Sequence, residues 1–225
     1  MDPVVCTALL GIRPGQSLVC HCAPKRCHAE VIAAQLQSGL QERLRSRQQK
    51  TYRYAGIGSR TTPAAVLSLM HRIAARLSEL GYTLLSGGAT GADSAFASGA
   101  SKNEIYLPWP AFRDHQSIFD LPSAEAFRVA ALLHPAWDSC SDRARALHAR
   151  NSHQILGADL RTPVDFVVCW TPDGCESEQD RSRRTGGTGQ AISLAHRWGV
   201  PVINLARGRG ALLSLADMVQ TNRDL

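Results

Sequence analysis

Residues 52–91, YRYAGIGSRTTPAAVLSLMHRIAARLSELGYTLLSGGATG, decide the fold. An apolar run ends at Gly56 and Gly58, and a second apolar run ends in another glycine-rich turn at residues 86–91. Between them, apolar residues recur every three or four positions over residues 64–80, which predicts an amphipathic helix. Gly81 follows as a typical helix-ending glycine. Strand, helix and strand joined by short connections predict a parallel βαβ unit.

The same alternation continues toward the C-terminus. The expected strands are 52–57, 82–85, 104–107, 164–170 and 200–205, and the expected helices are 64–80, 92–100, 124–133, 141–156, 190–198 and 212–219. Thr61 or Thr62 is expected to cap the first of these helices, with Pro63 in its first turn. The pattern predicts an α/β fold: an open, doubly wound, mainly parallel Rossmann-like sheet with helices on both faces.

Two parts of the chain differ in composition. Residues 1–50 contain a Cys/His-rich segment, an expected helix over 29–40 and a basic linker, and they carry seven basic and three acidic groups. Residues 51–225 carry 18 basic and 16 acidic groups, out of a net charge of +6 for the whole chain. We therefore expect a short N-terminal appendage and one nearly neutral main domain, which argues against a uniformly basic nucleic-acid surface.

Composition also excludes several classes of protein. Hydrophobic residues make up 44% of the chain and charged residues 20%, which is ordinary globular usage. No apolar run reaches the length of a membrane helix, and the N-terminus lacks the pattern of a signal peptide. Seven cysteines, an odd number, argue against a full disulfide framework. We expect a cytoplasmic protein without a membrane partner.

Three glycine clusters are candidate phosphate cradles. They are GIGSR at 56–60, SGGATG at 86–91 and TGGTG at 185–189, and each precedes a predicted helix. Glycines at strand-to-helix turns let backbone N–H groups approach phosphate oxygens, and the helix dipole favours the anion. None of the clusters is a Walker A motif or a G-x-G-x-x-G fingerprint. A nucleotide-type ligand is favoured over a conventional kinase, GTPase or dinucleotide site.

The blocks GIGSR, LLSGGATGADSAF, LHARNSHQI and TGGTGQAISLAHRWGVPVINL resemble the SLOG superfamily of Rossmann-like nucleotide-binding proteins. That group includes the DNA-processing protein DprA and the LOG phosphoribohydrolases. The resemblance covers residues 52–209 and is closest to the small stand-alone members of phages and bacteria. It implies a nucleotide or nucleotide-derived ligand, and it implies a homodimer as the common assembly.

The resemblance also assigns roles to residues of this chain. It implies these ligand- or phosphate-binding positions: Gly58, Ser59, Arg60, Gly87, Gly88, Thr90, Gly91, Gly186, Gly187, Thr188, Gly189 and Gln190. Arg150 corresponds to the arginine with which LOG enzymes cleave an N-glycosidic bond. The LOG glutamate position falls on Ser193, and Gln190 stands where the block has threonine, so a LOG-like mechanism lacks its acid/base group.

Other side chains are candidates to replace that glutamate or to assist it. Asp93 is the candidate catalytic carboxylate, with helix N-terminal stabilisation as its alternative role. His153 is three residues from Arg150 and so shares a helix face with it, as either a catalytic group or a surface histidine. The charged residues of the loop before TGGTG could contact a ligand or be solvated surface charges; they are Glu176, Glu178, Asp180, Arg181, Arg183 and Arg184. After the third strand, Trp109 and Phe112 could stack on a base or be buried under the loop.

The N-terminal segment carries candidate metal ligands in Cys20, Cys22, Cys27 and His28. The segment resembles the end of a small uncharacterised domain with a CxC…CH motif, of which only a remnant is present. Zinc binding, a reactive cysteine and simple packing remain alternatives. We predict no cofactor and assign no metal site.

Two functional hypotheses of different class follow. The first is binding of a nucleotide or nucleotide-derived molecule, with N-glycosidic hydrolysis as its possible chemistry. The alternative is a DprA-like single-stranded DNA-binding protein in DNA processing or recombination. A third interpretation, a structural or interaction module, treats the glycine turns as relics.

Overall fold

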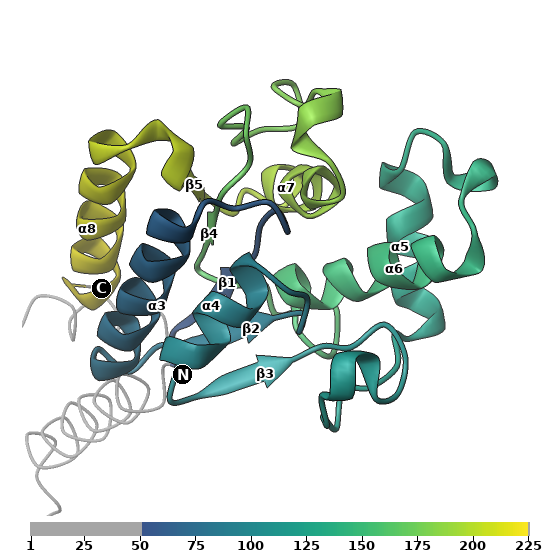
Figure 1. Ribbon diagram of the computed structural model, residues 1–225, viewed down its shortest axis with the longest axis horizontal. Coiled ribbons are helices and arrows are strands. Elements are labelled where there is room, and N and C mark those ends of the chain that lie inside the picture. The colour runs from purple at the N-terminus through teal and green to yellow at the C-terminus, as the bar shows by residue number, and fades with distance from the viewer. Residues whose placement is uncertain (1–50, 225) are drawn as a thin grey trace, which may run out of the picture. The chain divides into compact units, whose positions relative to one another are not determined.

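The computed structural model describes residues 51–224, and this part of the chain forms a five-stranded, all-parallel sheet with six α-helices (Figure 1). The strands are β1 (Arg53–Gly56), β2 (Thr83–Ser86), β3 (Asn103–Ile105), β4 (Phe166–Cys169) and β5 (Val202–Asn204). The helices are α3 (Ala64–Glu79), α4 (Ala92–Gly99), α5 (Ala124–Leu133), α6 (Asp142–Leu156), α7 (Thr188–Arg197) and α8 (Arg209–Asp224). The predicted doubly wound α/β class is confirmed.

The strand order is β3-β2-β1-β4-β5. The chain moves outward from β1 through β2 to β3 and then crosses back to place β4 on the other side of β1. Pairing runs in register, with Ala55 opposite both Leu85 and Val167. The switch point therefore lies between β1 and β4, and in open α/β sheets ligands bind outside the carboxyl ends of the strands at such a point.

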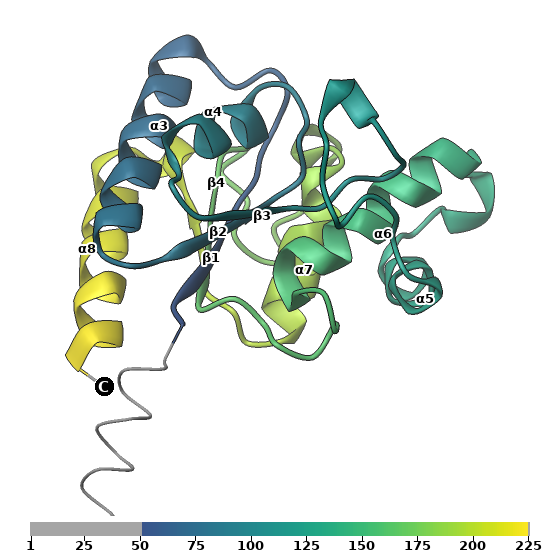
Figure 2. The same ribbon diagram turned by 90° about the horizontal axis from the view of Figure 1, so that it is seen from below.

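Alternating strand residues build two cores, one on each face of the sheet. Tyr54, Leu84 and Phe166 pack with α3, α4 and α8, and the Tyr54 and Phe166 rings stack with centroids 6.0 Å apart. Ala55 and Val167 pack on the opposite face with α5, α6 and α7. Figure 2 shows the two groups of helices on either side of the sheet. Both faces are covered, which explains why β4 reads as a continuous apolar run.

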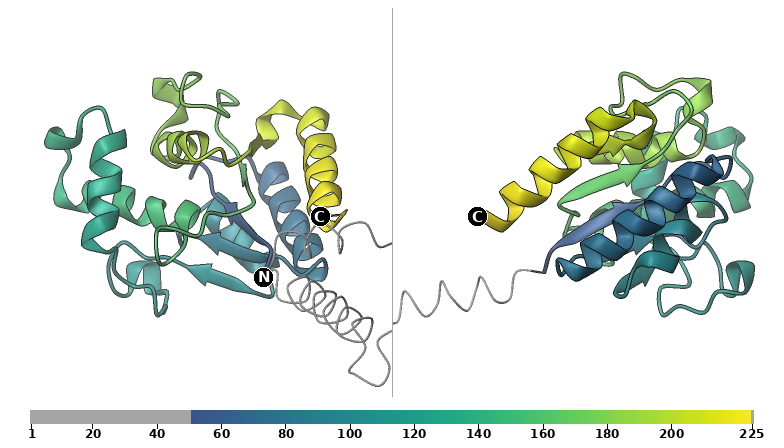
Figure 3. Two further views of the ribbon diagram at one scale, coloured as in Figure 1. Left: turned by 180° about the vertical axis from the view of Figure 1, so that it is seen from behind. Right: turned by 60° about the vertical axis from the view of Figure 1, so that its left-hand side comes forward.

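The last helix, α8, closes the fold beside α3 (Figure 3). Its buried residues Ala211 and Leu215 join the core that α3 and α4 form. The sequence predicted only residues 212–219 of this helix, because the apolar pattern is weak beyond them.

The start of α3 differs from the prediction. Pro63 is the N-cap residue and no side chain caps the helix. The Thr62 hydroxyl donates to the Ser59 carbonyl at 2.7 Å, and the Ser59 and Thr61 hydroxyls lie 2.8 Å apart. The two threonines therefore tighten the turn after β1, so the prediction that either one caps α3 is wrong.

None of the helices within residues 51–224 is long and apolar enough to cross a membrane. The predicted helix at 29–40, the basic linker and the candidate ligands Cys20, Cys22, Cys27 and His28 lie outside the described residues.

Candidate functional site

A cavity of about 440 Å³ opens at the carboxyl ends of the strands, at the switch point of the sheet. The turn after β1, the start of α4, one side of α6 and the turn before α7 form its walls. The lining residues are Ile57, Gly58, Ser59, Arg60, Thr61, Ala89, Asp93, Trp109, Phe112, Arg113, Leu147, Arg150, Asn151, Gln154, Arg184, Thr185, Gly186, Gly187, Thr188 and Ala191. A cavity of this size and place is typical of a small-molecule site.

A buried ion pair forms one wall of the cavity. Arg150 on α6 donates to Asp93 in the first turn of α4 at 3.1 Å, and each side chain is only 6% exposed. Asp93 also accepts the Ala89 N–H at 3.3 Å. The pair joins helices on opposite faces of the sheet, which fixes the distance between the turn after β2 and α6.

Gln154 completes this cluster from the next turn of α6. Its amide is satisfied when the oxygen faces Arg150. The oxygen then accepts from Arg150 Nη1 at 3.2 Å and from the Gly87 N–H at 2.9 Å, and the nitrogen donates to Asn151 Oδ1 at 2.9 Å. Arg150, Asn151 and Gln154 therefore act as one hydrogen-bonded group.

Burial raises the pKa of Asp93, and the charge and hydrogen bond of Arg150 oppose this effect. The backbone N–H groups of Ala89 and Gly87 also favour the ionised carboxylate. Asp93 thus depends on Arg150 for its charge. The carboxylate is committed to this partner and is not a free base.

Gly87 and Gly91 are required by close contacts. A Cβ at Gly87 would lie 1.1 Å from Arg150 Nη1, so any other residue would displace the guanidinium from Asp93. Gly91 has φ +89°, and a Cβ there would lie 2.9 Å from both Arg60 Cα and the Ser59 carbonyl oxygen. The turns after β1 and β2 therefore pack against each other through their backbones.

The lining of the cavity favours an anion. Arg60, Arg113 and Arg184 take part in no ion pair among residues 51–224, whereas the lining acid Asp93 is paired. Helices α4 and α7 begin after Gly91 and Gly187, and neither has a side-chain cap. The Ser94 and Gly189 N–H groups donate to the Ala89 and Gly186 carbonyls, so the positive dipole ends and the other first N–H groups are left to water or to a ligand.

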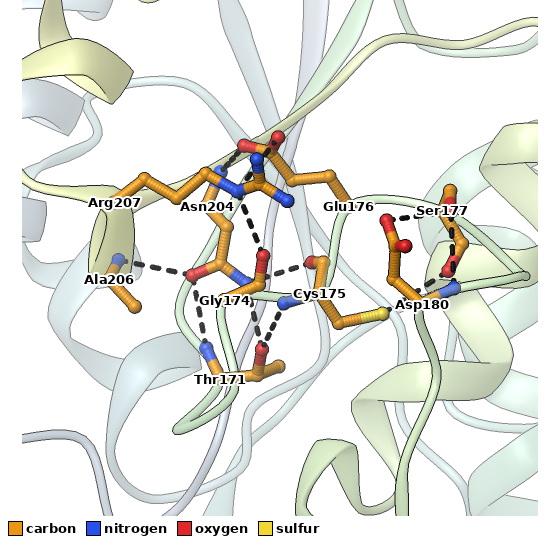
Figure 4. A network of polar contacts seen from close by, with 9 residues as sticks. All are labelled: Thr171, Gly174, Cys175, Glu176, Ser177, Asp180, Asn204, Ala206 and Arg207. Carbon is orange, nitrogen blue, oxygen red and sulfur yellow. Dashed lines mark hydrogen bonds and ion pairs between the residues drawn. The ribbon is translucent and has the colours of Figure 1, made fainter.

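A polar network anchors the loop that follows β4 (Figure 4). The fully buried Asn204 accepts the N–H groups of Thr171 and Ala206 and donates to the Thr171 hydroxyl, at 2.7 Å, and to the Cys175 carbonyl, at 2.8 Å. Glu176 accepts the Asn204 N–H at 2.8 Å. The start of this polar loop is therefore hydrogen-bonded to the end of β5.

A second anchor holds the end of the same loop. The Asp173 carboxylate accepts the hydroxyls of Ser182 and Thr185, each at 2.5 Å. Partial burial raises the pKa of Asp173, but these hydrogen bonds and one from Thr171 outweigh it and lower the pKa to about 2. An ionised Asp173 therefore places the turn that carries Arg184 and the glycines before α7.

We expect Asn204→Ala to lower the free energy of unfolding by about 2 kcal/mol, because buried partners lose their hydrogen bonds. Urea denaturation measures this change. The exposed Asn103 is the matched control, and Asn103→Ala should change stability by less than about 0.5 kcal/mol. An equal effect of the two substitutions would show that the network in Figure 4 does not stabilise the loop.

Several of the sequence-predicted residues line the cavity together: Gly58, Ser59, Arg60, Asp93, Arg150, Gly186, Gly187 and Thr188. The others lie outside its lining: Gly87, Gly88, Thr90, Gly91, Gly189 and Gln190. Gly87 and Gly91 shape the wall from behind. Gln190 is buried, and its amide atoms have no hydrogen-bond partner within residues 51–224.

Ser193, which the sequence resemblance aligns with the LOG glutamate, is fully buried in α7. Its hydroxyl donates to the Gly189 carbonyl at 3.0 Å and accepts from Arg181 at 2.9 Å. It does not line the cavity. A longer acidic side chain there would meet Arg181, which occupies this space.

Most of the charged residues in the loop after β4 interact with other residues of the protein and not with the cavity. Glu176 pairs with Arg207, and Glu178 pairs with Arg197. Asp180 accepts from the Ser177 hydroxyl. Among the charged loop residues considered from the sequence, Arg184 alone is part of the cavity lining.

His153 does not share the cavity with Arg150. Its ring stacks on Tyr106 with centroids 5.5 Å apart, and Nδ1 lies 3.0 Å from the Gly157 carbonyl oxygen. Burial lowers the pKa of His153. It is a buried residue, so the surface interpretation is wrong, and it lies outside the cavity lining that a catalytic role beside Arg150 would require.

Sequence reasoning did not single out Thr61, Asn151, Gln154 or Arg113 as cavity residues. Gln154 is four positions after Arg150 on one helix, and that spacing was a usable signal. Asn151 directly follows Arg150 and so points about 100° away around α6, yet it lines the cavity and its amide donates to the Gly187 carbonyl at 3.4 Å. The cavity extends around α6 far enough to contact both Arg150 and Asn151.

Comparisons with known proteins add little to this description. The family described as "Domain of unknown function (DUF4326)" matches residues 2–38. No curated protein matches the sequence. A solved structure of DNA processing protein A from Helicobacter pylori, reported for its single-stranded DNA binding mode, is similar over 75% of this chain and 83% of that chain, with 14% identity and a TM-score of 0.35. Likeness at that TM-score says nothing of what this chain binds.

Proposed function

We propose that this chain is a SLOG-type domain that binds a nucleotide or nucleotide-derived molecule in the switch-point cavity. One observation carries the proposal: arginines without ion pairs and the uncapped N-terminus of α7 line one cavity at the place where doubly wound sheets bind ligands. This combination is suited to phosphate groups, because backbone N–H groups and guanidinium groups are the usual phosphate donors in proteins.

The remainder of the cavity suits the nucleoside part. Trp109 and Phe112 lie edge to face with ring centroids 5.0 Å apart, and both line the cavity. An aromatic wall of this kind can stack on a base. Asn151 and Thr61 add hydrogen-bonding groups to the cavity lining. Ligand specificity would therefore come from the segment after β3 and from α6.

Binding is supported better than N-glycosidic cleavage. Cleavage requires a carboxylate close to the sugar and a group that protonates the leaving base. The carboxylate of Asp93 is already engaged by Arg150, and Ser193 stands in place of the second acid away from the cavity. Any hydrolysis would have to run through Asp93, so product analysis distinguishes the two activities.

A thermal-shift panel of nucleotides, with chromatography of each mixture afterwards, tests the proposal. A ligand present at 100 times its Kd should stabilise the fold by about 2.7 kcal/mol and be recovered intact. Arg60→Ala and Arg184→Ala should each weaken binding about tenfold to a hundredfold, because each removes a charge-assisted hydrogen bond. Recovery of the free base would show that the chain hydrolyses the nucleotide and does not only bind it.

Arg76→Ala is the matched control, because Arg76 is an exposed helix arginine that pairs with Glu79 and does not line the cavity. It should leave nucleotide affinity unchanged. If no nucleotide shifts the unfolding temperature, or if Arg76→Ala weakens binding as much as Arg60→Ala does, the proposal is wrong.

Single-stranded DNA is the second candidate ligand, and one observation favours it. Arg113 lies over the ring of Phe112 and Arg143 over that of Trp109, each at 5.7 Å. Aromatic rings interleaved with arginines are typical of single-strand platforms. A DNA ligand predicts that log affinity falls with log salt by about 0.7 per phosphate contacted, whereas a mononucleotide gives a shallow slope.

A further inference from the structure

Two histidines and a cysteine meet where α5 passes into α6. His134 is the residue after α5, Cys140 directly precedes the N-cap of α6, and His148 lies in α6 itself. One ligand atom from each lies within 4.8 Å of the other two. None of the three lines the switch-point cavity, so the proposed nucleotide site does not account for them.

Their spacing is close to that of a metal site. Cys140 Sγ lies 3.7 Å from His134 Nδ1 and 3.9 Å from His134 Nε2, and the two imidazole centroids are 4.4 Å apart. Tetrahedral zinc with ordinary Zn–S and Zn–N bonds places its ligand atoms about 3.5 Å apart. The ligand atoms, which lie within 4.8 Å of one another, therefore need to approach by up to about 1.3 Å to close around an ion.

One ring nitrogen in the cluster has an unmet requirement. His148 Nδ1 is buried and has no hydrogen-bond partner within residues 51–224. A buried nitrogen without a partner costs free energy, and a metal ion would satisfy it. This observation is independent of the spacing of the three side chains.

The segment that presents Cys140 is held in place. A short 3₁₀ turn, η2 (Trp137–Ser139), precedes it, and Arg145 of α6 reaches back to the carbonyls of Trp137, at 3.4 Å, and Asp138, at 3.2 Å. The guanidinium also lies over the Trp137 ring at 5.7 Å. The ligand segment is thus attached to the helix that carries His148.

We propose that His134, Cys140 and His148 bind a divalent transition-metal ion of the Zn²⁺ class, with water in the fourth position. A thiolate with two imidazoles is a ligand set that Zn²⁺ prefers over Mg²⁺ or Ca²⁺. The Cys140 thiol releases its proton to solvent as the ion binds, because only the thiolate coordinates. The ion would fasten the end of α5 to α6, the helix that carries Arg150.

Solvent access and nearby charges both affect metal binding at this cluster. His134 also lines a second, shallow cavity of about 360 Å³, which gives an ion a route from solvent. The positive charges of Arg150 and Arg181 act on His148. Asp93 offsets the charge of Arg150, but two neutral imidazoles do not offset that of Arg181, so binding depends on the negative charge of the Cys140 thiolate.

Co²⁺ titration of the full chain tests the proposal, in a background where Cys6, Cys20, Cys22 and Cys27 are replaced by serine so that the N-terminal thiols cannot contribute. The background protein should bind one Co²⁺ with visible tetrahedral bands and a thiolate-to-cobalt charge-transfer band. Cys140→Ser should abolish the charge-transfer band and weaken Zn²⁺ competition by roughly a hundredfold or more.

His134→Gln tests the site independently if Cys140→Ser fails to fold, and it should also remove the tetrahedral bands. His196→Ala, at an exposed histidine near the end of α7, is the matched control and should leave the spectrum unchanged. Absence of Co²⁺ binding by the background protein, or an unchanged spectrum in Cys140→Ser or His134→Gln, would overturn the proposal. These readouts do not involve nucleotide binding.

Discussion

Asp93→Ala is expected to lower the free energy of unfolding by about 3–5 kcal/mol, because it leaves the Arg150 guanidinium buried without its counter-charge. Both side chains are 6% exposed, so water cannot replace the lost carboxylate. Arg150 Nε already lacks a hydrogen-bond partner within residues 51–224, which makes the cluster sensitive to a further loss. Urea denaturation followed by circular dichroism measures the change.

Two further variants separate this effect from simple truncation. Glu79→Ala removes an exposed carboxylate from its pair with Arg76 and should cost less than about 1 kcal/mol. Asp93→Leu combined with Arg150→Met replaces both charges by apolar groups and should be more stable than Asp93→Ala. A loss below about 1 kcal/mol in Asp93→Ala would show that the pair does not hold the cavity wall together.

Gly87→Ala is expected to cost about 3 kcal/mol and to abolish nucleotide binding. The new Cβ would lie 1.1 Å from Arg150 Nη1 and 2.3 Å from its Cζ. The arginine side chain is flexible and can move away, but only by leaving Asp93. The substitution therefore breaks the ion pair without touching either of its members, and both denaturation and ligand titration report it.

Gly187→Ala provides the matched control for stability. Gly187 has ordinary helical angles, φ −63° and ψ −23°, and nothing lies within 4 Å of a Cβ built there. Alanine at this position should change stability by less than about 1 kcal/mol. If Gly87→Ala is as mild as Gly187→Ala, the close contact with Arg150 does not constrain the turn after β2.

Local patterns were sufficient to predict most of the sheet and its helices. The residues of α5 match the predicted range, because a serine cap and an apolar face define it without help from the rest of the fold. The start of α7 lies two residues before the predicted one. Gly187 adopts helical angles there, and a glycine gives no sequence signal for doing so.

The site was less predictable, because its decisive contacts join distant segments. The Asp93–Arg150 pair joins residues that are 57 positions apart, and no periodicity reports it. The path of the loop after β4 depends on Asn204 and Asp173, whose hydrogen bonds form only in the folded sheet. His153 follows Arg150 by three positions on α6, so the two residues were expected on one face of the helix. Because α6 packs against the core and also lines the cavity, His153 is buried among core residues, whereas Arg150 forms part of the cavity wall.

Calorimetric titration of a nucleoside monophosphate and of its parent nucleoside is the most direct test of the central claim, that this cavity binds a phosphate-bearing ligand. The base should be the one that gives the largest shift in the nucleotide panel. We expect one nucleotide per chain, with the nucleoside binding at least about tenfold more weakly, because it lacks the group that the turn before α7, Arg60 and Arg184 would hold. Equal affinity for the two compounds would contradict the claim, as would nucleotide affinity unchanged by Arg60→Ala.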